Sequence, residues 1–343
     1  MKKLTSVVVF IGGVFLGSWQ NSQFSIIPDS VSACDYCILT RGFTPPETLP
    51  GFGLRVDARY TLLNSVFSGT NQVINHSGEK ETHFTTQITM FYNFSDKFSL
   101  VGILPVPRRS VSVNARAEHH DGETEIEAAH GHDPVHRHTG SGTSFNLGDL
   151  NILGRYTFLR LNSFKQSTTL TLETGIKIPT GSTNSRDAEG NFLDAHIQPG
   201  TGSWNFLIGF SVNHANDYFG LSSNLLYSIN TTGEAGDDNY RYGNWLNADL
   251  TAKYEMFASE MRNRNLFLTL GINGEFRGKE EIDGQGIKNT GGKVLYIVPG
   301  FQFMISPAIT IEASFQYPFH HNLDGGEQLG ESLKTFFGVN YLL

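Results

Sequence analysis

Charge, cysteine and long apolar runs are all scarce in this chain of 343 residues. Charged residues make up 17% of it, against about 25% in an ordinary soluble domain, and the formal net charge is −8. Because acidic residues outnumber basic ones, the composition argues against a nucleic-acid-binding protein. Beyond the N-terminus no stretch of about 18 apolar residues occurs, which excludes a bundle of membrane-spanning helices. The two cysteines are too few for a disulfide-rich scaffold.

Glycine and aromatic residues are abundant by contrast. The chain has 37 glycines, and 12% of its residues are Phe, Trp or Tyr. Hydrophobic residues reach 39% but are spread along the chain rather than clustered. Chains that alternate apolar and polar residues have this composition, and membrane β-barrels are built from such chains.

Residues 1–33 have the features of a secretory signal peptide. Lys2 and Lys3 precede an apolar run at 7–16, which is too short to span a bilayer as a helix. Small residues before Cys34 allow cleavage there, or somewhat earlier. The same residues resemble a lipobox, which would place a lipid on Cys34. The sequence therefore predicts export and leaves the form of the mature N-terminus open.

Residues 34–51 would follow as a periplasmic N-terminal segment. Cys34 and Cys37 stand in a C-x-x-C arrangement, and a small disulfide loop in an oxidising compartment is the plain interpretation. A redox or metal site is the alternative, since two thiolates at this spacing can share a metal. No second C-x-x-C completes a four-ligand site, and Ile38 stands where haem attachment requires histidine.

From residue 52 to 343 the sequence alternates between apolar and polar residues with a period of two. In the first segment the apolar residues share one face, whereas Arg55, Asp57 and Arg59 share the other. A helix would scatter these residues, and a strand separates them. Each segment has roughly the 9–11 residues that a tilted strand needs to cross a bilayer. Twelve segments are predicted, at 52–62, 84–94, 98–106, 148–158, 168–178, 204–214, 218–229, 246–256, 266–276, 294–304, 309–319 and 333–343.

The connections between these segments alternate strictly between short and long. Long connections follow the odd-numbered segments, at 65–82, 107–147, 180–203, 230–244, 277–292 and 320–332. Outer-membrane barrels have short periplasmic turns, long external loops and an even strand count. The sequence thus predicts an all-β protein of the cell outer membrane. Its expected architecture is a transmembrane antiparallel up-and-down β-barrel of about twelve strands.

Several motifs within residues 50–343 resemble an outer-membrane β-barrel family named after the meta-pathway of phenol degradation, whose members are often labelled transporters. The motifs are Gly148-Asp149-Leu150 opening a strand that ends in Arg155-Tyr156, the strand end 177–181, and the strand entry 198–204. The resemblance implies a barrel and the passage of small molecules, without a settled substrate. The final residues Gly338, Tyr341 and Leu343 are similar to the signal that the outer-membrane assembly machinery recognises.

One face of the predicted strands carries charged residues that would line the lumen. A lumen lined by charges of one sign would indicate anion or cation selectivity. The signs here balance, which favours ion pairs across a narrow or partly plugged barrel. The alternative is a narrow polar channel for neutral or zwitterionic solutes. The predicted lumen-lining residues are Arg55, Asp57, Arg59, Arg155, Glu173, Lys177, Asp249, Lys253, Glu255, Glu275, Glu312 and Lys334.

The long connection 107–147 is rich in histidine and acid. It holds six of the chain's 12 histidines, which are His119, His120, His130, His132, His136 and His138. Neutral imidazole binds Zn, Cu and Ni, and nearby carboxylates can complete a ligand set, so weak capture of one of these metals is one interpretation. A polar external loop without a ligand is the second. A pH-responsive element is the third, since histidine changes its charge between about pH 5 and 8.

These features predict a channel or transporter for small solutes. Its expected partners are outer-membrane lipid, the assembly machinery and a small solute, with no nucleic acid and no cofactor apart from a weakly bound metal. A surface protein that binds Zn, Cu or Ni is one alternative, and a plugged structural barrel without transport is another. Catalysis is not predicted, because no G-x-S-x-G motif occurs and no strand-end serine can be paired with a histidine.

Overall fold

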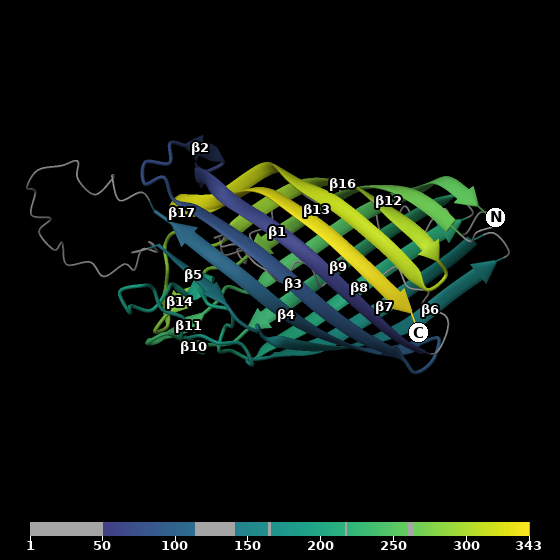
Figure 1. Cartoon of the computed structure of the whole chain (residues 1–343), viewed down its shortest axis with the longest axis horizontal. Coiled ribbons are helices and arrows are strands. Elements are labelled where there is room, and N and C mark those ends of the chain that lie inside the picture. Colours follow the sequence, from purple (N-terminus) through teal and green to yellow (C-terminus); the bar gives the residue numbers. More distant parts are fainter. Residues whose placement is uncertain (1–50, 114–140, 164–165, 217, 260–263, 343) are drawn as a thin grey trace, which may run out of the picture.

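The computed structural model describes residues 51–113, 141–163, 166–216, 218–259 and 264–342, and these form a β-barrel (Figure 1). Consecutive crossings are antiparallel neighbours, and the first pairs with the last, so the sheet closes on itself. The wall consists of β1 (Gly51–Gly69), β3 (Lys80–Asn93), β4 (Phe98–Ser112), β6 (Leu150–Ser163), β7 (Gln166–Ile178), β8 (Asn205–Asn216), β9 (Phe219–Asn230), β12 (Trp245–Ser259), β13 (Arg264–Arg277), β16 (Gly292–Ser306) and β17 (Ile309–Leu342). The predicted antiparallel up-and-down barrel is confirmed.

The long strand β17 makes two crossings. Its first arm, 309–323, runs along β16, and its second arm, 327–342, returns along β1. The chain reverses at Gly325 and Gly326, whose φ angles of 73° and 131° favour glycine. A closed barrel with only antiparallel pairs needs an even number of crossings, and counting both arms of β17 gives the predicted twelve. The long loop predicted at 320–332 is wrong, because strand geometry continues through these residues to a tight glycine turn.

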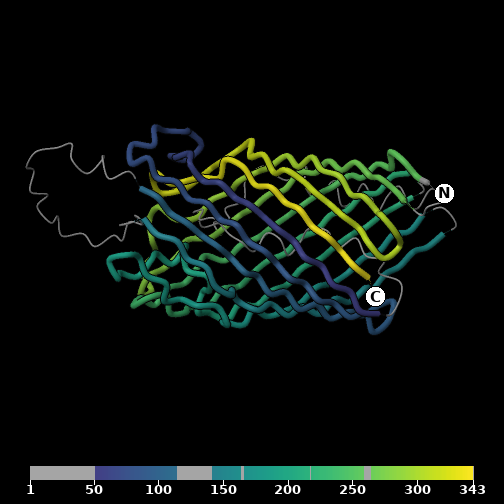
Figure 2. The backbone as a smooth tube through the Cα atoms, in the orientation of Figure 1, coloured from purple at the N-terminus to yellow at the C-terminus, as the bar shows by residue number. Residues whose placement is uncertain are grey.

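The two ends of the barrel differ. Short connections such as 94–97 and 307–308 lie at the end where β1 begins and β17 ends (Figure 2). Longer connections lie at the other end, which is external in outer-membrane barrels. There β2 (Asn71–Val73) pairs with β1, and β5 (Gly142–Phe145) pairs with β4. Strands β4 and β5 thus take residues from both ends of the predicted loop 107–147.

A separate small sheet lies at the external end of the barrel (Figure 1). It is formed by β10 (Gly233–Ala235), β11 (Asp238–Arg241), β14 (Glu281–Ile282) and β15 (Gln285–Gly286). Ala195, Ala235, Tyr240 and Ile287 form a buried apolar cluster against it. The two connections that carry these strands therefore fold into one unit over the mouth.

Apolar and polar residues that alternate in the sequence lie on opposite faces of the wall. On β8, Phe206 and Ile208 expose about half of their surface on the outside, whereas Asn205 and Ser211 are almost completely buried. Large apolar side chains are exposed in this way all around the barrel. Since the outer face of a membrane barrel is an apolar band, this surface faces lipid. Among the described residues, no helix is long and apolar enough to span a membrane.

Candidate functional site

All twelve predicted lumen residues lie on the face opposite to the exposed apolar band. Nine of them are buried, namely Arg55, Asp57, Arg59, Arg155, Glu173, Lys177, Asp249, Glu275 and Lys334. The other three, Lys253, Glu255 and Glu312, are partly buried. The inner face of the wall therefore carries charges of both signs.

The largest group of buried charges lies between β13 and the second arm of β17. Lys334 Nζ lies 2.8 Å from both carboxylate oxygens of Glu275 and 3.3 Å from Glu331. Arg277 lies 2.6 Å from Glu275 and 3.2 Å from Glu331. The ring of Tyr296 on β16 lies beneath Lys334, 4.6 Å from Nζ. These ion pairs pass over β16 and the first arm of β17, so they brace the wall from the inside.

Two further ion pairs join predicted lumen residues. Arg55 donates from Nε to Asp57 at 2.7 Å, and its guanidinium lies 2.5 Å from Glu312. The second pair joins Arg155 and Glu173 at 3.0 Å on the neighbouring strands β6 and β7. The opposite charges of the wall thus neutralise one another over short distances.

A polar cavity is lined by residues of β8, β9, β12, β13, β16 and β17. Asp249, Lys253 and Glu312 line it, together with several Asn, Ser and Thr side chains. Asn224 donates to Asp249 at 2.7 Å, and Lys253 donates to Gln302 at 3.1 Å. A hydroxyl or amino group of a solute would find both donors and acceptors here.

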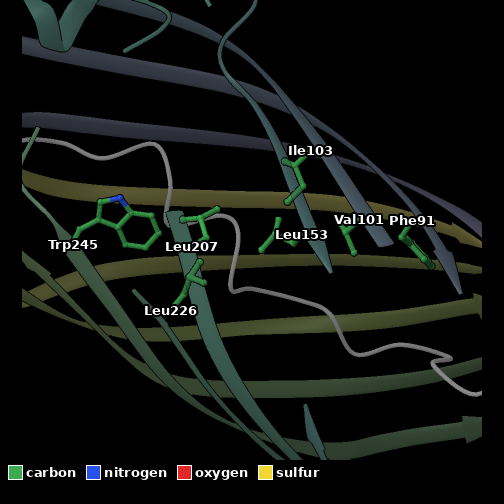
Figure 3. Packing of buried hydrophobic residues seen from close by; sticks show 7 residues of the cluster. All are labelled: Phe91, Val101, Ile103, Leu153, Leu207, Leu226 and Trp245. Atoms are coloured by element: carbon green, nitrogen blue, oxygen red, sulfur yellow. The ribbon is translucent and has the colours of Figure 1, made fainter. Parts of the chain in front are cut away.

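Seven buried apolar side chains form a row on the inner face of the wall, which we name the apolar stripe (Figure 3). Its members are Phe91 on β3, Val101 and Ile103 on β4, Leu153 on β6, Leu207 on β8, Leu226 on β9 and Trp245 on β12. Trp245 is the first residue of β12 at the external end, and Phe91 lies two residues before the periplasmic end of β3. The stripe therefore follows most of the length of the barrel.

Sequence reasoning missed the apolar stripe because it treated the inner face as polar. A signal was present on β4, where the run 100–104 is apolar apart from one glycine. Such a run indicates a strand that is apolar on both faces, because alternation is lost. On β8 and β9 no comparable signal exists, since Leu207 and Leu226 each stand alone among polar inward residues.

Residues 179–204, which we name the cap segment, lie against the inside of the wall at the external end. Arg109, an inward side chain of β4, donates to the carbonyl oxygens of His196 at 2.8 Å and Gln198 at 2.7 Å. Ser144 on β5 donates to the carbonyl oxygen of Ile197, which belongs to the short 3-10 helix η3 (Ala195–Ile197). The sequence places these residues in an external loop, and the structure folds them inward over the lumen.

Asp149, just before β6, fastens both ends of the cap segment. Its carboxylate accepts from the backbone N–H groups of Gly181 and Thr201, each at 2.9 Å, and from the Thr201 hydroxyl at 2.7 Å. Lys177 Nζ lies 3.2 Å away and balances the charge. The three motifs that carry the family resemblance therefore meet at one carboxylate.

Gly200 allows the two ends of the cap segment to approach closely. A Cβ on Gly200 would lie 2.5 Å from the carbonyl group of Gly181, which is backbone and cannot turn aside. We expect Gly200→Ala to destabilise the cap segment by about 1–3 kcal/mol, the usual cost of overpacking. Faster limited proteolysis between residues 182 and 199 would show this. Gly286→Ala is the control, since nothing lies within 4 Å of its added Cβ, and equal rates for both variants would contradict the prediction.

The cap segment also binds the small external sheet through buried polar contacts. His196 Nε2 lies 2.9 Å from Glu280, and Tyr240 on β11 donates its hydroxyl to the same carboxylate. Burial and the negative charge of Glu280 raise the pKa of Tyr240, so its hydroxyl stays protonated and remains a donor. Tyr242 donates to the carbonyl oxygen of Ala195 at 2.6 Å. Sequence reasoning missed this cluster, because its members come from three separate connections.

The predicted metal-binding histidines, His119, His120, His130, His132, His136 and His138, lie outside the described residues, as do Cys34, Cys37 and residues 1–33. Within the described part of the chain, no group of three or more His, Cys, Asp or Glu residues is arranged to hold a metal. His321 instead stacks on Phe67, with ring centroids 4.0 Å apart, and donates to the carbonyl oxygen of Glu331. Metal capture and the disulfide loop stay predictions.

Solved structures of outer-membrane β-barrels were compared with this fold. An outer membrane channel from Pseudomonas putida F1 aligns with a TM-score of 0.65 and 14% identity over 91% of this chain and 100% of its own. The β-domain of the Bordetella autotransporter BrkA aligns with a TM-score of 0.45 and 9% identity, over 86% of this chain and 100% of its own. The likeness to the Pseudomonas channel shows the fold alone, that of an outer-membrane β-barrel.

Comparison with curated protein sequences gives no significant match. A family model, by contrast, matches residues 65–322, which is about three quarters of the chain. The match runs from the end of β1 to the first arm of β17, including the cap segment and the motifs around Asp149. The chain belongs to the family described as the MetA-pathway of phenol degradation.

Proposed function

We propose that this protein is an outer-membrane channel for small solutes that are partly apolar. The apolar stripe carries the proposal, because it runs along the inner wall beside polar and charged side chains. A solute with an apolar body and one polar group would contact the stripe with the first and the polar cavity with the second. The family description refers to phenol degradation, and a phenol has this chemistry. The name of the Pseudomonas structure, an outer membrane channel, fits the same proposal.

Uptake of labelled phenol by intact cells tests the proposed function. Cells that express the protein should take up phenol faster than otherwise identical cells without it, and the purified barrel should carry current in planar bilayers. Equal uptake by both strains, together with an absence of single-channel current, would overturn the proposal.

The stripe variant Leu226→Asn should slow phenol uptake about fivefold. It replaces roughly 40 Å² of apolar contact with a polar group, worth about 1 kcal/mol at the usual coefficient. Ion conductance should not change, since the two side chains have the same branched arrangement of four heavy atoms. Thr251→Asn is the control, because it places the same side chain in the lumen, at the polar cavity and off the stripe. Unchanged uptake in Leu226→Asn would count against the stripe as the path.

A plugged barrel without transport is the second candidate function. The cap segment favours it, because its buried residues Ile197 and Gln198 occupy the external end of the lumen. This candidate predicts no conductance even after the cap segment is released. The conductance of cap variants therefore separates the two functions.

A further inference from the structure

The polar cavity reaches across the lumen and is more than a pit in the wall. Its lining residues come from β8, β9, β12, β13, β16 and both arms of β17, which are seven neighbouring crossings of the twelve. The cavity therefore borders more than half of the circumference. It contains about 630 Å³ of empty space, part of it open to the rest of the lumen, which is an ordinary size for a small-molecule site. A solute that moves along the lumen passes through this cavity.

Two inward positions without a side chain create this space. Gly271 on β13 and Gly300 on β16 each pair with lining residues of the neighbouring strands. An added Cβ would lie 2.6 Å from Oγ1 of Thr251 at Gly271, and 2.8 Å from Oγ1 of Thr269 at Gly300. Glycine at both positions thus keeps the lumen wide at this level and leaves hydroxyl groups around the space.

Glu312, on the first arm of β17, presents a hydrogen-bond acceptor to the cavity. Its Oε1 contacts the guanidinium of Arg55, which Asp57 holds through both of its carboxylate oxygens. Arg55 and Asp57 are almost completely buried, whereas 18% of the Glu312 side chain is exposed. In the described part of the chain, Arg55 is the one ion-pair partner of Glu312. The buried pair therefore fixes the carboxylate, and Oε2 is available to a solute.

Asn213, on β8, supplies a donor on the other side of the cavity. Its side-chain nitrogen Nδ2 is buried and has no hydrogen-bond partner among the described residues. A buried donor without a partner is costly, so a solute oxygen that accepts from Asn213 would be stabilised. A hydroxyl group can donate at one end of the cavity or accept at the other.

The remaining charges of the lining make the cavity a poor place for an anion. Asp249 accepts from Asn224 with both carboxylate oxygens. Lys253 donates to Gln302. Since Asp249 and Glu312 are both acidic, two of the three charged lining residues repel a carboxylate. An ionised carboxylate also has no hydrogen to donate to them.

The apolar stripe borders the cavity on its external side. Leu226 is the next inward residue after Asn224 on β9, and Asn224 lines the cavity. Two residues of a strand span about 7 Å, which is close to the length of one aromatic ring with its substituent. A ring in contact with Leu226 would therefore place its polar group in the cavity.

We propose that the polar cavity is a selectivity filter, which admits solutes whose hydroxyl or amino group donates a hydrogen bond to Glu312. It excludes solutes of similar shape that lack such a donor, and it excludes carboxylates. The proposal rests on the proposed channel function and names the polar group that the channel recognises.

Three solutes with the same ring test the filter on the wild-type protein. Phenol carries a donor, anisole carries a methyl group in place of the hydroxyl hydrogen, and benzoate is an anion at neutral pH. Protein-dependent uptake, the difference between cells with and without the protein, should be about tenfold faster for phenol than for anisole, because a hydrogen bond to a charged acceptor contributes about this factor. Benzoate uptake should be as slow as that of anisole.

Equal protein-dependent uptake of phenol and anisole would overturn the filter, and so would benzoate uptake as fast as that of phenol. A wild-type protein that takes up none of the three would instead overturn the channel function itself. The two failures are therefore distinguishable in one experiment.

The variant Glu312→Gln tests the assigned acceptor. The amide keeps the size of the side chain, and a neutral hydrogen bond is about half as strong, so the ratio of phenol to anisole uptake should fall about threefold. Arg55 keeps its ion pair with Asp57, so no buried charge loses its last partner. Glu255→Gln is the matched control, because Glu255 lies on the inner face of β12 outside the lining of the cavity, where Asn265 binds it at 2.6 Å.

The control should keep the wild-type ratio of phenol to anisole uptake. Heat-dependent migration in gel electrophoresis checks that both variants are folded barrels. A folded Glu312→Gln barrel with the wild-type ratio would overturn the role of Glu312, and the three solutes on the wild-type protein decide the filter even where the variant does not fold.

Discussion

The Asp149→Ala variant is expected to raise the ion conductance of the barrel, because the cap segment loses its main attachment. The carboxylate accepts three hydrogen bonds from Gly181 and Thr201, and bonds to a charged acceptor contribute about 1.5–3 kcal/mol each. Losing even about 3 kcal/mol would shift the equilibrium between attached and detached cap about 100-fold. Single-channel recording in planar bilayers measures the change as longer or larger open events.

Asp187→Ala is the matched control for this experiment. Asp187 belongs to the same cap segment, and within the described part of the chain its carboxylate accepts hydrogen bonds from neighbours in its own exposed turn, such as Asn191 at 2.7 Å. Removing it should therefore leave conductance at the wild-type level. A folded Asp149→Ala barrel with wild-type conductance would show that the cap segment does not restrict the lumen.

The Lys334→Met variant is expected to destabilise the barrel by about 3–5 kcal/mol, the cost of breaking a buried ion pair by removing one partner. Lys334 is almost completely buried, and among the described ion pairs Arg277 still contacts both Glu275 and Glu331 after its loss. The two buried carboxylates would then lose one of the positive charges that balance them. Urea unfolding of the barrel in lipid vesicles measures the loss.

Two comparisons make this result specific. Lys279→Met removes an exposed lysine and should change stability by no more than about 0.5 kcal/mol. The double variant Lys334→Met/Glu331→Gln restores the balance of charge and should recover part of the loss. A single variant as stable as the wild type would mean that water or neighbouring groups compensate Glu275 and Glu331 without Lys334.

Period-two alternation predicted the wall well, because a membrane barrel must place apolar residues outside on every crossing. The segments 246–256 and 266–276 fall within β12 and β13. The long loop predicted at 320–332 from the spacing of the strand segments is wrong. The apolar–polar alternation weakens in 320–332 because residues near the external end lie beyond the lipid. Strand hydrogen bonding continues there even though the side chains no longer alternate. Glycines at 325 and 326 were the better signal for a tight reversal.

The parts of the candidate site that sequence could not predict depend on contacts between distant segments. The sequence around Asp149 does not indicate that its side chain binds residues 181 and 201. The glycine-rich motifs around all three positions were recognised only as family motifs. His196 falls in the connection predicted as an external loop at 180–203, and it is buried against Glu280. A connection folds inward when side chains of the lumen, such as Arg109, can bind it. A single sequence does not show which connection a lumen side chain binds.

The register between β1 and β17 has a consequence for how the protein is made. Gly53 pairs with Leu342, so the cylinder cannot close until nearly the whole polypeptide has been synthesised and delivered. Until then two unpaired strand edges are available to other chains, and such edges promote aggregation. Contacts this distant in sequence also slow folding, because entropy is lost before they form. Biogenesis therefore requires the nascent polypeptide to be shielded throughout its transit, and a truncated product lacking the second arm of β17 would be a target for proteolysis.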